Sequence, residues 1–196
     1  MKNEGNPSKV YVALLHYPVY NRNKEVVTSA VTNLDIHDIA RLARTYSLAG
    51  YFIVTPDEEQ AELVKKICSH WLEGYGSSYN FDRGSALSLV SIVKDLKSAV
   101  RRIEGEQGKE PGLLATTALE KERYKNKRLS FVNARETIEC NDRPQLIILG
   151  TAWGLSDNIL REVDHILEPV KCNGNYNHLS VRTAAAIVID RLLGNR

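Results

Sequence analysis

Short apolar segments alternate with longer amphipathic ones along most of this chain. The apolar segments predict buried strands at residues 10–16, 51–55, 86–90, 112–116, 145–149 and 164–167. Helical spacing of the apolar residues predicts helices at 35–47, 56–72, 93–105, 156–162 and 179–193, with an extended piece at 130–132 and a helical turn at 135–140. Because strands and helices alternate, we expect an α/β domain in which helices cover both faces of an open, mostly parallel sheet.

Polar residues and glycines mark the boundaries of this pattern. Asp35 is the predicted N-cap of its helix, and Gly50 occupies the position expected of that helix's C-cap. Residues 74–84, rich in glycine and tyrosine, are expected to form a loop. Residues 17–32 form a polar segment that is unusually long for a loop in a compact domain, so they are a functional candidate.

Composition indicates one cytoplasmic domain. The chain has 196 residues, 43% hydrophobic and 26% charged, which suffices for a core in a single domain spanning 1–196. Cys68, Cys140 and Cys172 form no CxxC pair, and the histidines lack metal-ligand spacing, so we expect neither disulfides nor a metal site. The polar start is unlike a signal peptide, and no apolar run is long enough to span a bilayer.

One segment is strongly basic although the whole chain has a net charge of only +2. Residues 121–128 (KERYKNKR) hold five cations against one anion, with a tyrosine among them. This composition is typical of a surface that contacts nucleic-acid phosphates. The predicted RNA-contacting residues here are Lys121, Arg123, Lys125, Lys127 and Arg128. A solvated loop or helix face is the alternative interpretation.

Three predicted loops can together build one pocket. They begin at Thr116 after GLLA, at Gly150 after QLIIL, and at Glu168 before the last helix. The carboxyl ends of parallel strands share one edge of a sheet, which is where open α/β folds bind ligands. The apolar wall of such a pocket would come from Ala152, Trp153, Leu155, Pro169 and Val170. Taken singly, Gly150 and Gly154 are also compatible with an ordinary turn. Walker A, GxGxxG and GxSxG signatures are absent.

The order of GTAWGL (150–155) and NHLSVR (177–182) near the C-terminus resembles the last two motifs of the SPOUT class of RNA methyltransferases. The resemblance implies a C-terminal trefoil knot within about 112–196, bound S-adenosylmethionine, a tRNA or rRNA substrate, and a homodimer. The small apolar helix face at 183–189 is suited to subunit packing, although a core face has the same pattern. The implied cofactor-binding residues are Thr116, Leu149, Gly150, Thr151, Gly154, Leu155, Pro169, Val170, Asn177, His178, Leu179 and Ser180.

Residues 32–50 are similar to the first motif of the SPOUT subclass that methylates ribose 2′-hydroxyls. In the best register Arg44 falls on the arginine regarded as catalytic in that subclass, and Asp38 replaces its asparagine. Arg41 would lie on the same helix face as Arg44 and contact RNA. The alternative is a surface ion-pair cluster.

The last motif departs from the pattern as well, because His178 replaces either its serine or its asparagine. Imidazole titrates near neutral pH, so His178 is the expected general base, unless it caps the last helix instead. These departures leave ribose hydroxyl, base nitrogen and base carbon open as the methyl acceptor. They also leave open a catalytically inactive RNA-binding module of the same fold, or a flavodoxin-like nucleotide-binding protein.

Overall fold

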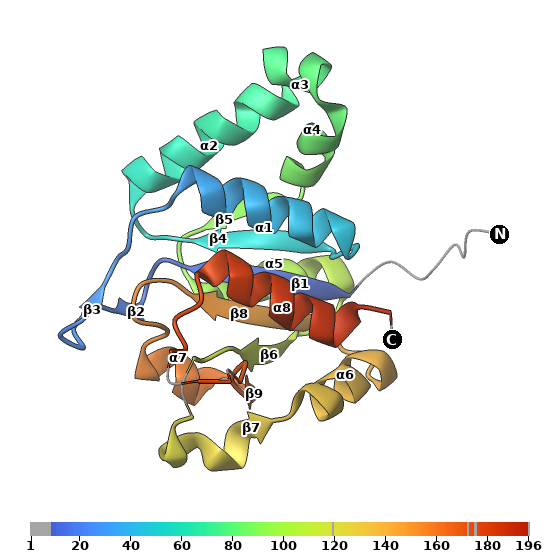
Figure 1. Cartoon of the computed structure of the whole chain (residues 1–196). Helices are drawn as coiled ribbons and strands as arrows, with labels where there is room; N and C mark the ends of the chain where they lie inside the picture. Colours follow the sequence, from blue (N-terminus) through green and yellow to red (C-terminus); the bar gives the residue numbers. More distant parts are fainter. Residues whose placement is uncertain (1–8, 119, 172, 175, 196) are drawn as a thin grey trace.

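The computed structural model describes residues 9–118, 120–171, 173–174 and 176–195. Within them, seven parallel strands form one sheet of order β5-β4-β1-β8-β6-β9-β7 (Figure 1). These strands are β1 (Val10–Leu15), β4 (Gly50–Val54), β5 (Val90–Val93), β6 (Gly112–Ala115), β7 (Arg128–Leu129), β8 (Gln145–Gly150) and β9 (His165–Leu167). A separate antiparallel ladder joins β2 (Val19–Tyr20) to β3 (Val26–Val27).

Helices cover both faces of the sheet, as predicted. The helices are α1 (Asn33–Thr45), α2 (Glu58–Leu72), α3 (Tyr75–Tyr79), α4 (Phe81–Leu87), α5 (Leu96–Gln107), α6 (Phe131–Cys140), α7 (Asp157–Glu162) and α8 (Val181–Leu193), with a 3₁₀ helix η1 (Glu122–Lys127). Helices α1, α2, α6 and α8 pack on one face, and α5 and α7 on the other. Strand β1 is buried on both sides, with Val12 and Leu14 in the first core and Tyr11 and Leu15 in the second.

The parallel strands bring distant segments to one edge of the sheet. Leu15 at the end of β1 pairs with Val54 of β4 and with Gly150 of β8. Strand β8 also pairs with β6, and β6 pairs with β9. The chain therefore leaves β1, β8, β6 and β9 at the same edge, which lies at the left in Figure 1 beside the β2–β3 hairpin.

Several predicted boundaries are wrong for identifiable reasons. Thr32, not Asp35, is the N-cap of α1, because its hydroxyl accepts the backbone N–H of Asp35 at 3.2 Å. Gly50 is not a helix cap: it begins β4, and the chain leaves α1 through Ser47, whose φ of 53° is left-handed.

The segment predicted as a loop at 74–84 and a strand at 86–90 is also different. Helices α3 and α4 fill it, with Asn80 capping α4, and the strand begins only at Val90. Helix α6 likewise begins at Phe131, inside the piece predicted to be extended. In the part of the chain that the structure describes, no helix is both long and apolar enough to cross a membrane.

Candidate functional site

The three loops singled out from the sequence meet at the carboxyl edge of the sheet. They follow β6, β8 and β9, which are neighbours in the order β8-β6-β9. Asn177 links two of them directly, because its side-chain amide donates to the carbonyl oxygens of Ala118 at 3.1 Å and Val170 at 3.3 Å. Thr116 is held between strands by bonds from its N–H and its hydroxyl to the carbonyl of Ile148. The predicted convergence of these loops is therefore present.

The glycine loop at 150–155 differs from the prediction, because Leu155 packs into the core instead of forming a pocket wall. An added Cβ at Gly150 would lie only 2.8 Å from both the backbone nitrogen and Cγ of Leu155, so Leu155 fills the space beside this glycine. Leu155 and Leu149 have their side chains in the core. Gly154, with a φ of 94°, faces open space, and Ala152 is also left-handed at 51°. Ligand access to this loop is consequently through its backbone around 152–154.

The β2–β3 hairpin holds the glycine loop from outside. Tyr20 exchanges two backbone hydrogen bonds with it, donating to Gly154 O at 2.9 Å and accepting from Trp153 N at 2.9 Å. Ser156 N donates to Pro18 O at 3.2 Å, and Val19 bridges to Leu155. Trp153 itself is 66% exposed, so it does not line a closed apolar slot as predicted.

A partly buried chain of polar side chains ties the loop that follows β1 to the glycine loop. His16 Nδ1 lies 3.0 Å from Ser29 Oγ, which lies 2.5 Å from Thr151 Oγ1. Thr151 Oγ1 in turn donates to Leu15 O at 3.0 Å. Burial of the imidazole lowers the pKa of His16 below its ordinary value, although the charge of Asp35 acts against this. The side chain of Thr151 is thus engaged within the protein.

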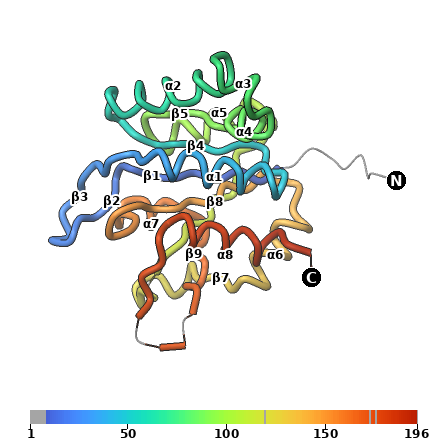
Figure 2. Tube along the Cα trace, turned by 45° about the horizontal axis from the view of Figure 1, so that its top comes forward, coloured from blue at the N-terminus to red at the C-terminus, as the bar shows by residue number. Residues whose placement is uncertain are grey.

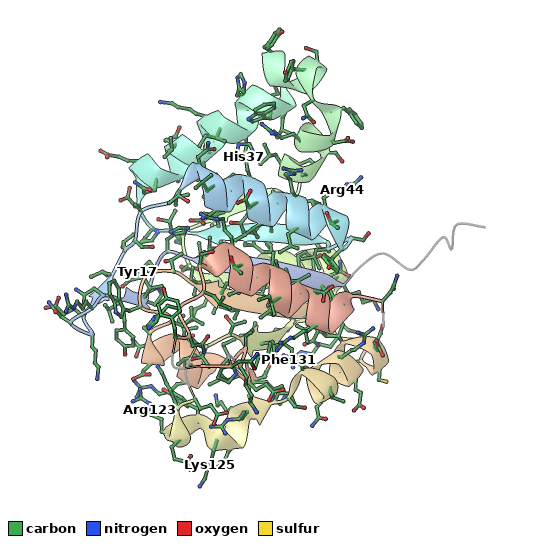
Figure 3. All side chains as sticks on the ribbon, viewed as in Figure 1. Tyr17, His37, Arg44, Arg123, Lys125 and Phe131 are labelled. Atoms are coloured by element: carbon green, nitrogen blue, oxygen red, sulfur yellow. The ribbon has the colours of Figure 1, made fainter. Side chains whose placement is uncertain are left out.

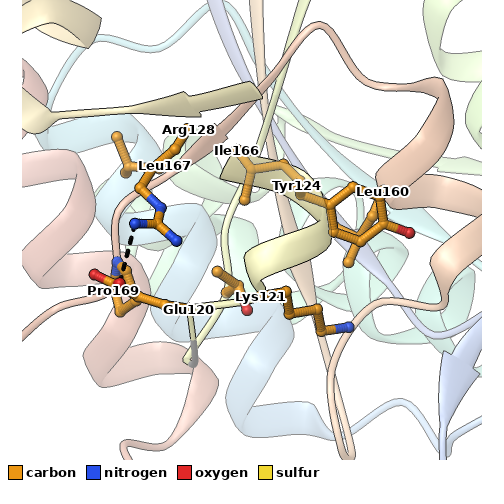
Figure 4. Close-up of a pocket in the computed structure, with 9 residues that line it drawn as sticks. Glu120, Lys121, Tyr124, Arg128, Leu160, Ile166, Leu167 and Pro169 are labelled. Atoms are coloured by element: carbon orange, nitrogen blue, oxygen red, sulfur yellow. Dashed lines mark ion pairs between the residues drawn. The ribbon is translucent and has the colours of Figure 1, made fainter. Parts of the chain in front are cut away.

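A hollow of about 280 Å³, open to solvent, lies beside the loops that follow β6 and β9 (Figure 4). Its apolar lining comes from Tyr124, Leu160, Ile166, Leu167 and Pro169, and its polar lining from Thr117, Glu120, Lys121 and Arg128. Arg128 and Glu120 form an ion pair at 3.0 Å across it. Of the predicted cofactor residues, Pro169 lines this hollow.

Helices α1 and α8 place a cation between two carboxylates near the same edge. Arg182, in the first turn of α8, donates from Nη1 to Asp35 at 3.2 Å and from Nε to Asp38 at 3.3 Å. Asp35 is buried and also accepts the hydroxyl of Thr32 at 2.7 Å. Sequence reasoning missed Arg182. The available signal was a cation at a helix N-terminus, where the helix dipole disfavours positive charge.

Arg44 lies away from this group. Six helical residues, about 9 Å, separate it from Asp38, and it belongs to the last turn of α1. Its neighbour Tyr46 donates to Asp190 of α8 at 2.8 Å, so this end of α1 lies beside the C-terminal half of α8 (Figure 3). His178 precedes the N-terminus of α8 and is exposed, with its ring 5.2 Å from that of Tyr176. A single chain therefore does not bring Arg44 and His178 together.

Helix capping at the start of α8 belongs to Ser180, which accepts the N–H of Thr183 at 3.2 Å, and not to His178. Leu179 is exposed beside it. On α1, Arg41 is exposed like Arg44.

Most cations of residues 121–128 have partners within the protein. Lys121 and Arg123 pair with Asp157, whose pKa they lower although partial burial raises it. Lys127 donates to the carbonyl oxygens of Arg161 and Val163 and so caps the end of α7. Arg123 and Lys125 remain more than half exposed and project outward in Figure 3.

Possible metal ligands do not gather in the described residues, where no group of three or more His, Cys, Asp or Glu side chains could hold an ion. Cys68 and Cys140 are free thiols. Cys172, the third cysteine, lies outside the described residues.

Comparison with known families covers nearly the whole chain. Residues 9–194 match the model of a SAM-dependent RNA methyltransferase family, SAM being S-adenosylmethionine. The chain belongs to this family. Membership confirms the resemblance to this class that the two C-terminal loops carry, and it disfavours the flavodoxin-like alternative.

Relatives of known sequence agree with this family but differ in length. The chain is 43% identical over 186 residues to a tRNA (guanine-N(1)-)-methyltransferase of Oleidesulfovibrio alaskensis, covering 95% of the chain and 42% of that protein. It is 37% identical to an uncharacterized protein of Aquifex aeolicus, covering 93% of the chain and 87% of that protein. The chain thus spans less than half the length of the relative whose reaction is named.

Among solved structures, the SpoU methyltransferase AviRb from Streptomyces viridochromogenes in complex with AdoMet is similar, with a TM-score of 0.58 and 14% identity over 97% of this chain and 61% of that one. This likeness confirms the SPOUT-like fold.

The family's cofactor suits the residues at the sheet edge. Gly154 leaves open space where a side chain would stand, and five of the nine residues that line the hollow beside Pro169 are apolar.

Proposed function

We propose that the protein transfers a methyl group from S-adenosylmethionine to tRNA. One observation carries the proposal: in a chain of this family, loops 116–118, 150–155 and 168–180 meet at one sheet edge, where Asn177 joins the first to the third. When bound, the cofactor supplies an activated methyl group on a sulfonium, so the protein has to align the acceptor and remove any proton it carries. Isothermal calorimetry with S-adenosylmethionine, FMN and ATP tests the cofactor: heat of binding from FMN or ATP alone would contradict the proposal.

The choice of tRNA is supported by the name of the 43%-identical relative. That name also specifies guanine N1, but the chain matches only 42% of the protein that bears it, so the name does not assign N1 chemistry to the matched part. Mass spectrometry of nucleosides from tRNA and rRNA of a deletion strain identifies the acceptor. Loss of one methylated nucleoside from tRNA is the expected result, and loss from rRNA alone would refute the choice of tRNA.

Within the chain, we assign the cofactor to the single domain 1–196, with residues 112–196 as its knotted part. The backbone of 152–154 would contact the cofactor on one side and Pro169, Val170 and residues 177–180 on the other. His178, exposed beside these loops, is the proposed proton acceptor. Asp38, joined to Arg182 at 3.3 Å, would help fix the position of the acceptor nucleotide.

A shared site in a homodimer is the arrangement that lets Arg44 and His178 act together, because they lie at opposite ends of the α1–α8 pair in one chain. On α8, Ala185, Val188 and Ile189 pack inside the subunit, whereas Thr183 and Ala186 remain exposed for contact with a second copy. Mixing Arg44→Ala with His178→Ala subunits should restore one intact site per heterodimer and part of the methylation rate. Proven heterodimers without restored activity would rule out the shared site.

A further inference from the structure

The β2–β3 hairpin projects from the carboxyl edge of the sheet, as the cartoon and the tube trace both show (Figures 1 and 2). Its strands pair Val19 with Val27 and Tyr20 with Val26. Asn21 locks the turn: its side-chain oxygen accepts the N–H groups of Asn23 at 2.9 Å and Glu25 at 3.0 Å, and its amide donates to the Glu25 carboxylate at 2.7 Å. A turn with so many internal bonds loses little conformational entropy on binding a partner.

The tip of this hairpin presents two unpaired cations. Arg22 and Lys24 are exposed, and neither has an ion pair or hydrogen bond from its side chain within residues 9–118, 120–171, 173–174 and 176–195. The acid at the tip, Glu25, is engaged by Asn21. Residues 121–128, in contrast, commit most of their cations to Asp157, Glu120 and the end of α7.

The base of the hairpin is continuous with the glycine loop. Tyr20 exchanges backbone bonds with Trp153 and Gly154, and its hydroxyl accepts the N–H of Asp157 at 3.1 Å. Two aromatic side chains are exposed at this junction, Trp153 at 66% and Tyr17 at 39%. Exposed aromatic rings at the base of an arm and cations at its tip are a combination suited to single-stranded RNA, since the cations pair with phosphates and the rings stack on bases.

We propose that the β2–β3 hairpin is an RNA-binding arm. Arg22 and Lys24 bind phosphates of the substrate strand, and Trp153 stacks on an unpaired base that is thereby held beside the glycine loop. This inference rests on the proposed function, because it places the RNA next to the cofactor-binding loop. It moves the main phosphate contact from residues 121–128 to the hairpin.

A salt titration of RNA affinity tests the phosphate contacts. Binding of bulk tRNA and of a mixed-sequence single-stranded RNA is measured at rising KCl for Arg22→Gln/Lys24→Gln. The matched control is Lys94→Gln/Lys97→Gln, which removes two exposed cations from the α5 region. The arm variant should flatten the slope of log affinity against log salt by roughly 1–2 units, and the control should leave it unchanged.

Equal salt slopes for the arm variant and the control variant would show that RNA affinity depends on charge spread over the whole surface rather than on the hairpin. If Arg123→Gln/Lys125→Gln flattens the salt slope more than the arm variant does, residues 121–128 make the main phosphate contact. Either result overturns the proposal.

Trp153 is tested separately. Trp153→Ala should weaken RNA binding by about 5- to 150-fold, the range expected for one lost base stack, while Trp153→Phe retains most of the affinity. Because the backbone of 152–154 belongs to the proposed cofactor site, calorimetry with S-adenosylmethionine is run on both variants beside the RNA titrations. Loss of cofactor affinity in Trp153→Ala would assign the indole to the cofactor instead. If the wild-type protein binds the cofactor and methylates RNA but all arm variants behave like the control, only the arm is refuted; if the wild-type protein binds no RNA, the proposed function fails with it.

Discussion

Replacing Gly150 with alanine should disturb the cofactor loop without touching any ligand directly. The new Cβ would stand 2.8 Å from the Leu155 backbone nitrogen, 2.8 Å from its Cγ and 2.9 Å from its Cδ2. A side chain can rotate away, but the backbone nitrogen moves only if the whole turn at 150–155 shifts. Overpacking of this kind costs about 1–3 kcal/mol. For a chain of this size, that lowers the melting temperature by about 2–12 °C.

The assay combines thermal unfolding with calorimetric titration of S-adenosylmethionine. Gly105→Ala is the matched control, because Gly105 lies inside α5 and an added Cβ would meet nothing within 4 Å. The control should raise stability by about 0.5–1 kcal/mol and leave cofactor affinity intact. Gly150→Ala should lose both stability and cofactor affinity. An unchanged melting temperature would refute the packing argument, and a lowered one with full affinity would show that this turn is not a wall of the cofactor site.

Three further predictions concern individual side chains. Lys127→Met should lower the free energy of unfolding, measured in urea, by about 1–2 kcal/mol, because it removes the cap on α7. Lys125→Met removes only an exposed ion pair and should leave this free energy unchanged, so equal effects of the two substitutions would contradict the capping role. Arg182→Ala leaves the buried Asp35 without its cation and should lower the free energy of unfolding by about 1–3 kcal/mol, a range that allows for the partial exposure of the arginine. Adding Asp35→Asn should recover part of this loss, and simple addition of the two losses would show that Arg182 and Asp35 are not coupled. Burial lowers the pKa of His16, so the folded state binds a proton at this imidazole less readily than the unfolded state does. The free energy of unfolding is therefore unaffected by His16 above its unfolded pKa of about 6.5 and decreases as the pH falls below that value. The unfolding free energy should therefore drop between about pH 7.5 and about pH 5.5 by more in the wild-type protein than in His16→Asn, and parallel profiles would exclude His16 as the cause.

The sheet could be predicted because its strands are buried on both faces and appear in the sequence as unbroken apolar runs, as in β1. Helices α3 and α4 could not, because Tyr75, Tyr79 and Phe81 are exposed, so this segment lacks an apolar stripe at helical spacing. The loops of the candidate site were predictable from strand ends alone. The Arg182–Asp35 contact joins residues 147 apart in the chain, and no local pattern reports it. The intramolecular partners of residues 121–128 could not be predicted for the same reason, since the carbonyl groups that Lys127 contacts lie at the end of α7.

The most direct test of the account is transfer of a labelled methyl group from S-adenosylmethionine to bulk tRNA by the purified protein, compared with its Asn177→Ala variant. Asn177 donates two hydrogen bonds that join two of the three loops, worth together about 1–3 kcal/mol. We expect label in the RNA with the wild-type protein and a rate about 5- to 150-fold lower with the folded variant. Wild-type protein that binds the cofactor yet leaves the RNA unlabelled would contradict the proposed function, and an undiminished rate in the variant would contradict the site.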